Sequence, residues 1–446
     1  MPTETSQRMT LRMCYKRNRH DLFVRINYIY STTDTYIITF CYPFYPFYKM
    51  KAVFVAHRHG ARFMSAPQVG NNSSPQNEDF WKLHSMQLTP QGSNQLEDLG
   101  KQLAIAYPEM LDRVEVFSSN TTRTVGSAMA LLDGLVPGHA HHIECGYKNP
   151  VYVPNSITIH VEKNKQFDSL FHLGKKTNAK WRKQNIKESK IIDGLETEEN
   201  VSLLDKLFTM SNCSSIDPCK SFTDRVSSIT MFVNLVRYGM VHSSHILPNA
   251  LGIKLSAKEL ERIIELGNVV YSHYFTPSNG VKTKDTGSSC FMLLDEICRR
   301  MTASETKGFY IYSAHDTTLL ALSAAFGLIV PCPDFASYFI FELFHDGIVN
   351  VKVNMRPREI RLNELNRIWW SSENSFLELE AVEEGSFTVQ DFIDRFSHKC
   401  YPKLLDIISK KCDMPIDPIV FTYFERGGTW NDDSLREISY RFGQTI

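Results

Sequence analysis

The sequence lacks the features of two protein classes, integral membrane proteins and disulfide scaffolds. No segment reaches the roughly 18 consecutive apolar residues that a membrane-spanning helix needs. The nearest candidate, residues 36–48, is short and is interrupted by Pro43 and Pro46. Ten cysteines among 446 residues are too sparse for a disulfide framework, and no pair has the CxxC spacing of a zinc site. Because no apolar run is long enough to span a membrane, we predict no stable membrane insertion.

Net charge is also absent, because 49 lysines and arginines balance 49 aspartates and glutamates. A neutral chain is a poor general binder of polyanions, so we predict no nucleic-acid partner. Balance over the whole chain still permits a local cluster of basic side chains. With 43% hydrophobic and 22% charged residues, the composition is that of an ordinary globular protein.

Glycine is missing from residues 1–49, where seven basic residues outnumber three acidic ones. No amphipathic period runs through this segment, so we interpret it as an atypical N-terminal extension that need not fold. A start of translation at Met50 would favour a cytoplasmic protein, whereas a targeting or anchor segment upstream would favour a secretory or lysosomal route. The sequence therefore leaves the localisation undetermined.

From Met50 onward, strand patterns alternate with helical ones. Residues 53–56 form a continuous apolar run, as in a buried parallel strand. Thr89 and Pro90 are a typical N-cap and first helical residue. Further strands are predicted at 114–117, 309–313, 338–344 and 348–353, and further helices at 125–132, ended by Gly134, and at 319–326. This order predicts an α/β fold with a doubly wound, mostly parallel sheet flanked by helices.

The region between residues 151 and 285 differs from its surroundings. It is polar, and its periodic parts have helical spacing, at 201–210, 228–238 and 257–274. We predict that it is a smaller, mainly helical insertion domain that caps the sheet. The α/β domain would then consist of residues 50–150 and 286–400. Residues 401–446 would be a C-terminal extension, for which the sequence indicates no function.

The sharpest motif is Arg-His-Gly-Ala-Arg at residues 58–62, which directly follows the first predicted strand. Ligands of open α/β sheets bind at the carboxyl ends of strands. Arg58 and Arg62 can each offer a planar fork of donors to an oxyanion. His59 can attack phosphorus once its other ring nitrogen is held by a backbone carbonyl. The motif therefore predicts a nucleophile between two phosphate ligands.

A second motif, His315-Asp316, lies at another strand end and opens a helix. His315 can donate to a phosphate oxygen, and Asp316 can protonate a leaving oxygen. The alternative is that Asp316 only caps the helix. A helix N-terminus favours the ionised carboxylate, whereas a bound phosphate dianion raises its pKa, and the sequence does not decide between these effects.

Arg123 repeats this placement, because it begins the helix that follows the strand at 114–117. A third arginine beside a helix N-terminus suits an anion. An exposed arginine in a first helical turn is the simpler alternative. The repeated strand-end position favours the inclusion of Arg123 in the phosphate site.

Together these motifs resemble the histidine acid phosphatases, the acid-phosphatase and phytase branch of the histidine phosphatase superfamily. The segments at 88–92 (Leu-Thr-Pro-Gln-Gly) and 339–343 (Phe-Ile-Phe-Glu-Leu) are similar to other parts of that family. The resemblance implies a phosphoglycerate-mutase-like fold and a phosphomonoester hydrolase without a metal or organic cofactor. It also implies a phosphohistidine on His59, a proton donor at Asp316, and phosphate ligands at Arg58, Arg62, Arg123 and His315.

The sequence departs from the family's pattern ahead of Arg123. Phe117 and Asn120 stand where the family often has arginine and aspartate, so the charge network around Arg123 is expected to differ. Two other functions stay open, a phosphoglycerate-mutase-like phosphotransferase and a non-catalytic phosphate-binding protein. The identity of the small-molecule phosphomonoester and a homodimeric state also stay open.

Overall fold

The described residues fall into two compact units. The computed structural model describes residues 14–18, 21–25, 49–64, 83–145, 156–161, 170–171, 182–187, 192–210, 221–242, 255–275, 290–326, 328, 330–355, 377–378 and 386–396. The smaller unit holds residues 1–50 and 344–346. Within it, β1 (Cys14–Asn18) and β2 (Asp21–Arg25) pair in antiparallel orientation, so part of the predicted N-terminal extension has strand structure. The predicted extension at 401–446 lies outside the described residues.

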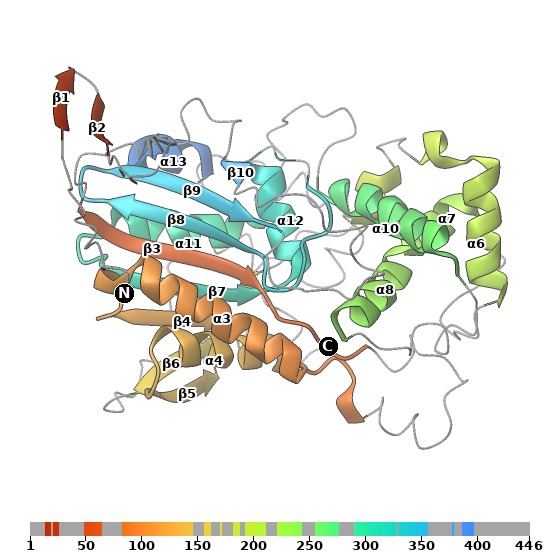
Figure 1. Ribbon diagram of the computed structural model, residues 1–446, viewed down its shortest axis with the longest axis horizontal. Coiled ribbons are helices and arrows are strands. Elements are labelled where there is room, and N and C mark those ends of the chain that lie inside the picture. Colours follow the sequence, from red (N-terminus) through yellow and green to blue (C-terminus); the bar gives the residue numbers. More distant parts are fainter. Residues whose placement is uncertain are drawn as a thin grey trace, which may run out of the picture. The chain divides into compact units, whose positions relative to one another are not determined.

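Among the described residues, nine strands form one sheet in the larger unit, in the order β10-β9-β8-β3-β7-β4-β6-β5 with β11 also paired to β9 (Figure 1). The pairs from β3 through β7, β4 and β6 to β5 are all parallel. The predicted mostly parallel α/β sheet is therefore confirmed. Its parallel strands are β3 (Met50–Arg58), β4 (Val114–Ser118), β5 (Ala140–Cys145), β6 (Ser156–Val161) and β7 (Gly308–Ala314).

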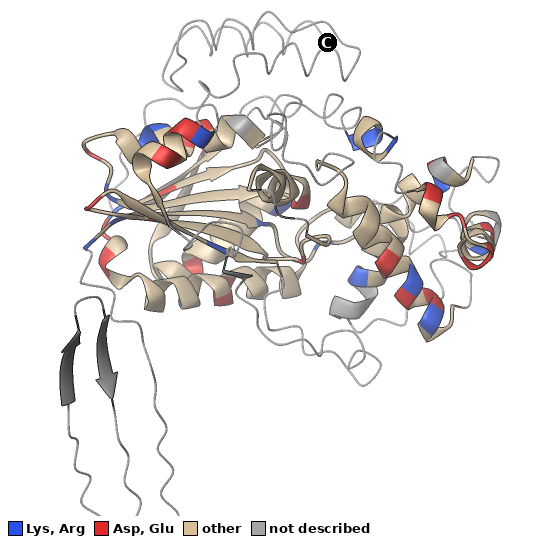
Figure 2. Cartoon of the chain, turned by 90° about the horizontal axis from the view of Figure 1, so that it is seen from above, with Lys and Arg blue, Asp and Glu red and all other residues tan. Residues whose placement is uncertain are grey.

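Helices cover both faces of this sheet, as a doubly wound fold requires. On one face α3 (Pro90–Ala106) packs against α4 (Thr122–Leu135), with the short turn η1 (Pro108–Met110) after α3. On the other face lie α11 (Phe291–Thr302) and α13 (Val389–Phe396) (Figures 1 and 2). Charged residues lie mostly on the helices, while the central strands carry few (Figure 2). The sheet is therefore the apolar layer of the unit.

Two glycines allow the close approach of α3 and α4. A Cβ at Gly134 would lie 1.9 Å from the carbonyl oxygen of Glu97, and a Cβ at Gly100 would lie 2.1 Å from that of Leu131. The prediction that Gly134 ends its helix was wrong, because α4 continues through Leu135. The small residue is needed for contact between the helices, not for a left-handed helix end.

The other edge of the sheet is antiparallel. The predicted hairpin is confirmed, with β8 (Tyr338–Phe344) and β9 (Ile348–Asn354) joined through Gly347, whose φ of 84° suits glycine. The short strands β10 (Leu377–Glu378) and β11 (Ser386–Thr388) pair with β9. Phe326, at the end of α12 (Asp316–Ala325), packs against Phe396 of α13 with ring centroids 4.5 Å apart. This aromatic contact joins α13 to the end of α12.

The region predicted to be a helical insertion is mainly helical where it is described. It contains η2 (Asp193–Leu195), α6 (Glu198–Met210), α7 (Phe222–Ser228), α8 (Thr230–His242) and α10 (Ala257–Ser272). Two details differ from prediction. The helix expected at 228–238 begins at Thr230 instead of residue 228, because α7 ends at Ser228. In addition, β6 lies inside the range 151–285 but belongs to the sheet, so the insertion begins later than residue 151.

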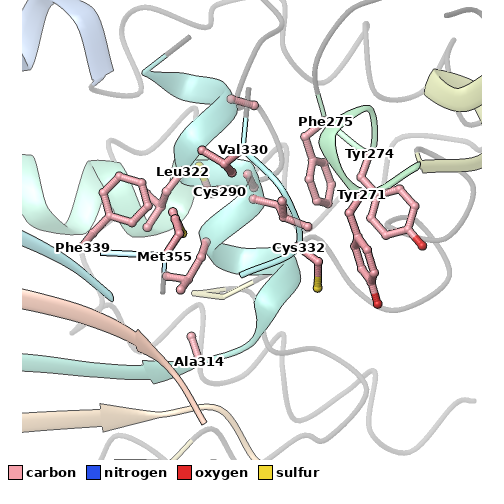
Figure 3. Packing of buried hydrophobic residues seen from close by; sticks show 14 of the residues in the cluster. Tyr271, Tyr274, Phe275, Cys290, Ala314, Leu322, Val330, Cys332, Phe339 and Met355 are labelled. Carbon is pink, nitrogen blue, oxygen red and sulfur yellow. The ribbon is translucent and has the colours of Figure 1, made fainter. Parts of the chain in front are cut away.

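Buried apolar side chains join the helical region to the sheet. Tyr271 of α10 and Tyr274 and Phe275, which follow this helix, lie on the same side of the cluster as Cys332; Phe339 and Met355 lie farther along it (Figure 3). These side chains belong to one continuous hydrophobic core. Within the described part of the chain, no helix is both long enough and apolar enough to cross a bilayer.

Candidate active site

The carboxyl ends of three adjacent strands bring the predicted site residues together. In the parallel register, Arg58 at the end of β3 pairs with Ala314 at the end of β7, and Ser118 at the end of β4 pairs with Ser313. The chain continues from these ends into His59, His315 and Ser119. Since parallel strands end at the same edge, residues more than 250 positions apart become neighbours. The imidazole rings of His59 and His315 lie with centroids 5.7 Å apart.

The imidazole of His59 is held in one tautomer. Its Nδ1 lies 2.8 Å from the carbonyl oxygen of Gly60, and because a carbonyl only accepts, Nδ1 must carry the proton. Nε2 therefore keeps its lone pair. Burial, followed by the positive charges of Arg123 and Arg58, holds the pKa of His59 well below its usual value. The ring is thus neutral and can act as a nucleophile at Nε2.

The loop that carries His59 is fastened by its backbone. The amide of Gly60 donates to Ser127 Oγ of α4 at 3.0 Å, and the amide of Ala61 donates to Gln95 Oε1 of α3 at 2.9 Å. The carbonyl of Ala61 accepts from both the amide (2.9 Å) and the hydroxyl (3.0 Å) of Thr89. Thr89 is also the N-cap of α3, as predicted, so the helix start and the loop share one anchor.

The contact between this loop and α3 leaves no room for side chains. A Cβ at Gly60 would lie 2.1 Å from the carbonyl oxygen of Gly92, and a Cβ at Gly92 would lie 2.0 Å from the carbonyl oxygen of Ala61. Both glycines therefore permit a close approach of two backbones. This explains in physical terms why the sequence places glycine at 60 and at 92.

Arg58 is completely buried and is held on several sides. Its Nη2 lies 2.9 Å from Oδ2 of Asp316, its Nη1 donates to the carbonyl of Pro333, and its guanidinium stacks 4.4 Å above the ring of Phe335. Its Nε has no hydrogen-bond partner among the described residues. Buried donor capacity on Arg58 therefore remains for a further acceptor.

His315 and Arg123 are in contact with each other within the site. Arg123 Nη2 donates to His315 Nδ1 at 3.3 Å, which leaves Nε2–H to donate to Ser119 Oγ at 2.8 Å. Within the described part of the chain, the buried Nε of Arg123 has no hydrogen-bond partner, like that of Arg58. Ser119 was not predicted, although it directly follows a strand end, as His59 and His315 do in the same sheet.

The three arginines crowd positive charge into a small buried volume. Burial and the charge of Arg58 lower the pKa of Arg62 to about 10, and burial and the charge of Arg62 lower the pKa of Arg123 to about 10. Both guanidiniums remain protonated near neutral pH. Mutual repulsion among buried cations is relieved by an anion, so this arrangement favours an oxyanion such as phosphate.

Asp316 supplies the negative charge nearest to these cations. It is the first residue of α12, whose N-cap is His315, and its Oδ1 accepts from the amide of Thr317 at 2.7 Å. Burial acts to raise the pKa of Asp316, but the charge of Arg58, with smaller contributions from its neighbours, lowers that pKa to about 2. The carboxylate is therefore ionised when the phosphate site is empty.

The expected difference in the charge network ahead of Arg123 has a structural counterpart. The guanidinium of Arg300, from α11, lies 4.8 Å above the ring of Phe117 and donates to Glu115 at 2.7 Å. The ring of Phe117 also stacks on Tyr312 of the next strand, at 5.4 Å. A cation is therefore present beside Phe117, but it comes from a helix remote in sequence.

No group of three or more histidine, cysteine, aspartate or glutamate side chains in the described residues is arranged to bind a metal ion. The donors around His59 are instead mostly guanidinium and imidazole nitrogens. Such donors recognise oxyanions, and a charged guanidinium does not coordinate a cation.

Comparison with known proteins agrees with this geometry. The sequence profile of the histidine phosphatase superfamily (branch 2) matches residues 45–233. Lysosomal acid phosphatase of Bos taurus is 26% identical over 335 residues, which are 72% of this chain and 72% of that protein. Lysosomal acid phosphatase of Xenopus laevis is 26% identical over 324 residues, 69% of each chain.

A solved structure shows the same fold. The phytase of Citrobacter braakii superposes with a TM-score of 0.52 and 16% identity, over 82% of this chain and 98% of that one. At this identity the likeness concerns the fold alone. Profile and relatives support a phosphomonoester hydrolase similar to branch 2 of the histidine phosphatase superfamily, and the superposition agrees with this on the fold alone.

Proposed function

We propose that this hydrolase works through a phosphohistidine on His59, with Asp316 as the proton donor to the leaving group. The observation that carries the proposal is the position of His59. Its ring is neutral, its Nδ1 is occupied by a carbonyl, and it lies beside buried cations whose Nε donors have no partner among the described residues. A nitrogen lone pair and an oxyanion site therefore share one small volume.

Phosphate binding begins with the cations. A phosphomonoester carries close to two negative charges near neutral pH, since its second pKa is about 6. Arg58, Arg62 and Arg123 neutralise this charge, and the Nε2–H of His315 switches its hydrogen bond from Ser119 Oγ to a phosphate oxygen. The charge of the transition state is spread over the equatorial phosphoryl oxygens, so guanidiniums fixed in advance stabilise it most effectively.

In the first chemical step, Nε2 of His59 attacks phosphorus. The N–P bond forms as the ester P–O bond breaks, and the proton of Asp316 passes to the departing alkoxide oxygen. The products are a phosphohistidine and an alcohol. In the second step, the carboxylate of Asp316 takes a proton from water, whose oxygen attacks phosphorus and breaks the N–P bond. Inorganic phosphate leaves and His59 regains its lone pair.

The Arg58–Asp316 ion pair explains how Asp316 acquires its proton. In the empty site this carboxylate is ionised because Arg58 stabilises its charge. A phosphate dianion competes for the same guanidinium and adds a negative charge nearby. Both effects raise the pKa of Asp316. Substrate binding therefore prepares the proton donor, and the proton comes from the solvent or from a monoanionic ester.

The decisive experiment is a single-turnover trap. Enzyme is mixed with a ³²P-labelled aryl phosphate, quenched in alkali and tested for protein-bound label that acid releases, as expected for phosphohistidine. His59→Ala should fold normally and retain no label. Label that persists in His59→Ala would refute the assignment of the nucleophile. Transfer of label to a second alcohol instead of release as phosphate would favour a phosphotransferase.

The cellular route is a separate proposal. The relatives reported above carry the word lysosomal in their names, and this supports a secretory or lysosomal route over a cytoplasmic location. Mass spectrometry of natural material tests it. Peptides from residues 1–49, or glycosylated peptides, would support the route, whereas an N-terminus at Met50 would contradict it.

A further inference from the structure

Arg237 is a buried arginine that the catalytic scheme does not use. It lies on α8 in the helical region, with 7% of its surface exposed. Its Nη2 donates to the carbonyl of Cys332 at 3.0 Å and its Nη1 donates to the carbonyl of Pro333 at 3.2 Å. The same Nη1 lies 3.5 Å from Oδ1 of Asp334, which is also buried. One guanidinium thus contacts three consecutive residues.

Those three residues begin the segment 332–337, which surrounds the start of the catalytic motif. The carbonyl of Pro333 accepts from Arg58 as well as from Arg237. The carbonyl of Ser337 accepts from the amide of Arg58 at 2.8 Å. Phe335 supplies the ring beneath the Arg58 guanidinium, with its centroid 6.0 Å from that of His59. The segment therefore fixes both the backbone and the side chain of Arg58.

The segment 332–337 is not held by regular secondary structure. Ala336 has a φ of 59°, a left-handed conformation that costs energy for a residue with a Cβ. Its amide donates to the carbonyl of His59 at 3.3 Å. A strained segment keeps its conformation only when its surroundings hold it in place. Arg237 provides three such contacts at the start of the segment.

We propose that Arg237 is a positioning residue, which sets the orientation of the Arg58 guanidinium through the Pro333 carbonyl that both arginines share. The inference rests on the proposed function, because it concerns the phosphate ligand of that site. It assigns to α8 a direct part in the geometry of the phosphate site, although Arg237 itself does not contact substrate.

The chemistry of the contact requires arginine. The guanidinium is planar, and its two terminal nitrogens reach two adjacent carbonyls at once. A lysine keeps the charge opposite Asp334, but its single nitrogen cannot occupy both positions. The charges of Arg237 and Asp334 also neutralise each other, so removing one partner alone leaves an unpaired buried charge and destabilises the fold. Two variants follow from this reasoning, Arg237→Lys and the double variant Arg237→Met/Asp334→Asn.

Both variants should fold and both should lose turnover. A displacement of about 1 Å at a positioned group can cost roughly 100-fold in rate, so we expect kcat to fall about 10- to 100-fold with a much smaller change in KM. Arg262→Gln is the matched control. Arg262 lies on α10, in the same helical region, and donates to Asn200 at 2.8 Å, away from segment 332–337. It should keep kcat within about twofold of the wild type.

A double-mutant cycle separates positioning from general damage. If Arg237 acts through Arg58, Arg237→Lys should have almost no further effect in an Arg58→Lys background. An equal loss in both backgrounds would overturn the proposal, as would unchanged kcat in both Arg237 variants. A loss in Arg262→Gln as large as in Arg237→Lys would also overturn it.

The same cycle can be measured without turnover. Orthovanadate is a phosphate-like oxyanion that can adopt five-coordinate geometry, and its dissociation constant can be measured by calorimetry for all four proteins of the cycle. Weaker vanadate binding in Arg237→Lys, lost in the Arg58→Lys background, supports the positioning role; vanadate binding that does not change refutes it. If the wild type formed no phosphohistidine, the assignment of His59 as nucleophile would be refuted. The vanadate measurement would still test the positioning role of Arg237.

Discussion

Substitution of Gly92 by alanine should damage the catalytic loop from outside the site. A Cβ at this position would lie 2.0 Å from the carbonyl oxygen and 2.5 Å from the amide nitrogen of Ala61. These are backbone atoms, so no side-chain rotation can relieve the clash. Overpacking of this kind typically costs 1–3 kcal/mol, and we expect about 2–3 kcal/mol because α3 or the loop must move as a whole.

The movement reaches the nucleophile directly, because Ala61 is only two residues from His59. A shift of about 1 Å at a catalytic group can lower the rate roughly 100-fold. We therefore expect kcat on an aryl phosphate to fall by about 10- to 100-fold, with a thermal midpoint lower by several degrees. Steady-state kinetics and a thermal melt measure the two effects.

Gly126→Ala is the matched control for Gly92→Ala. Gly126 lies within α4, and its Cβ would approach only the Leu88 side chain, at 3.4 Å, which is ordinary contact. Alanine inside a helix is favoured over glycine by roughly 0.5–1 kcal/mol, so this variant should be slightly stabilised and fully active. If Gly92→Ala behaved like Gly126→Ala, the argument from backbone contact would be refuted.

Three further substitutions test individual contacts. Asp316→Asn should slow the hydrolysis of alkyl phosphates about 100-fold or more, and that of nitrophenyl phosphate less, because a good leaving group needs little protonation. Equal losses of rate with both substrates would contradict the role of Asp316 as proton donor. The lowered pKa of Asp316 also stabilises the fold at pH above its unfolded value of 3.8, and this stability is lost as pH falls through about 2. Urea melts should therefore show that Asp316→Asn is destabilised near pH 6 but not near pH 2. Ser119→Ala removes the partner of His315 Nε2, and a loss of about 1 kcal/mol should lower kcat/KM about fivefold, whereas an unchanged value would show that Ser119 does not orient the ring. Thr89→Ala removes an N-cap and should cost about 1 kcal/mol in a urea melt; no change would contradict the capping role.

The sequence was sufficient to predict the central part of the fold and the composition of the candidate site. Apolar runs followed by His59 and by His315 identified two parallel strands, and parallel strands end at a common edge. That single rule predicts that residues far apart in the chain converge, and the structure brings all six predicted residues into one region. The same rule applied to β4 would also have identified Ser119.

Other features depend on contacts that no local pattern encodes. The segment 332–337 has no period, and its link to Arg237 joins residues about 95 positions apart, so neither was predicted. β5 was missed because its sequence, Ala-His-His-Ile-Glu-Cys, has no apolar alternation. β6 does alternate, with Ile157, Ile159 and Val161 on one face, and a period of two would have identified it. Gly134 was misread because a glycine that ends a helix and one that admits a neighbouring helix look alike in sequence.

The pairing of Arg58 with Asp316 also bears on which anions the empty site accepts. The buried cation already has a counter-ion supplied by the protein, so an anion from solution must displace a carboxylate held at 2.9 Å. Chloride offers a single charge and no hydrogen-bond geometry that matches a guanidinium fork. A phosphate ester offers several oxygens and a higher charge, so we expect it to displace the Asp316 carboxylate from Arg58, whereas halides do not. Discrimination against common salts would then be a property of the resting protein itself.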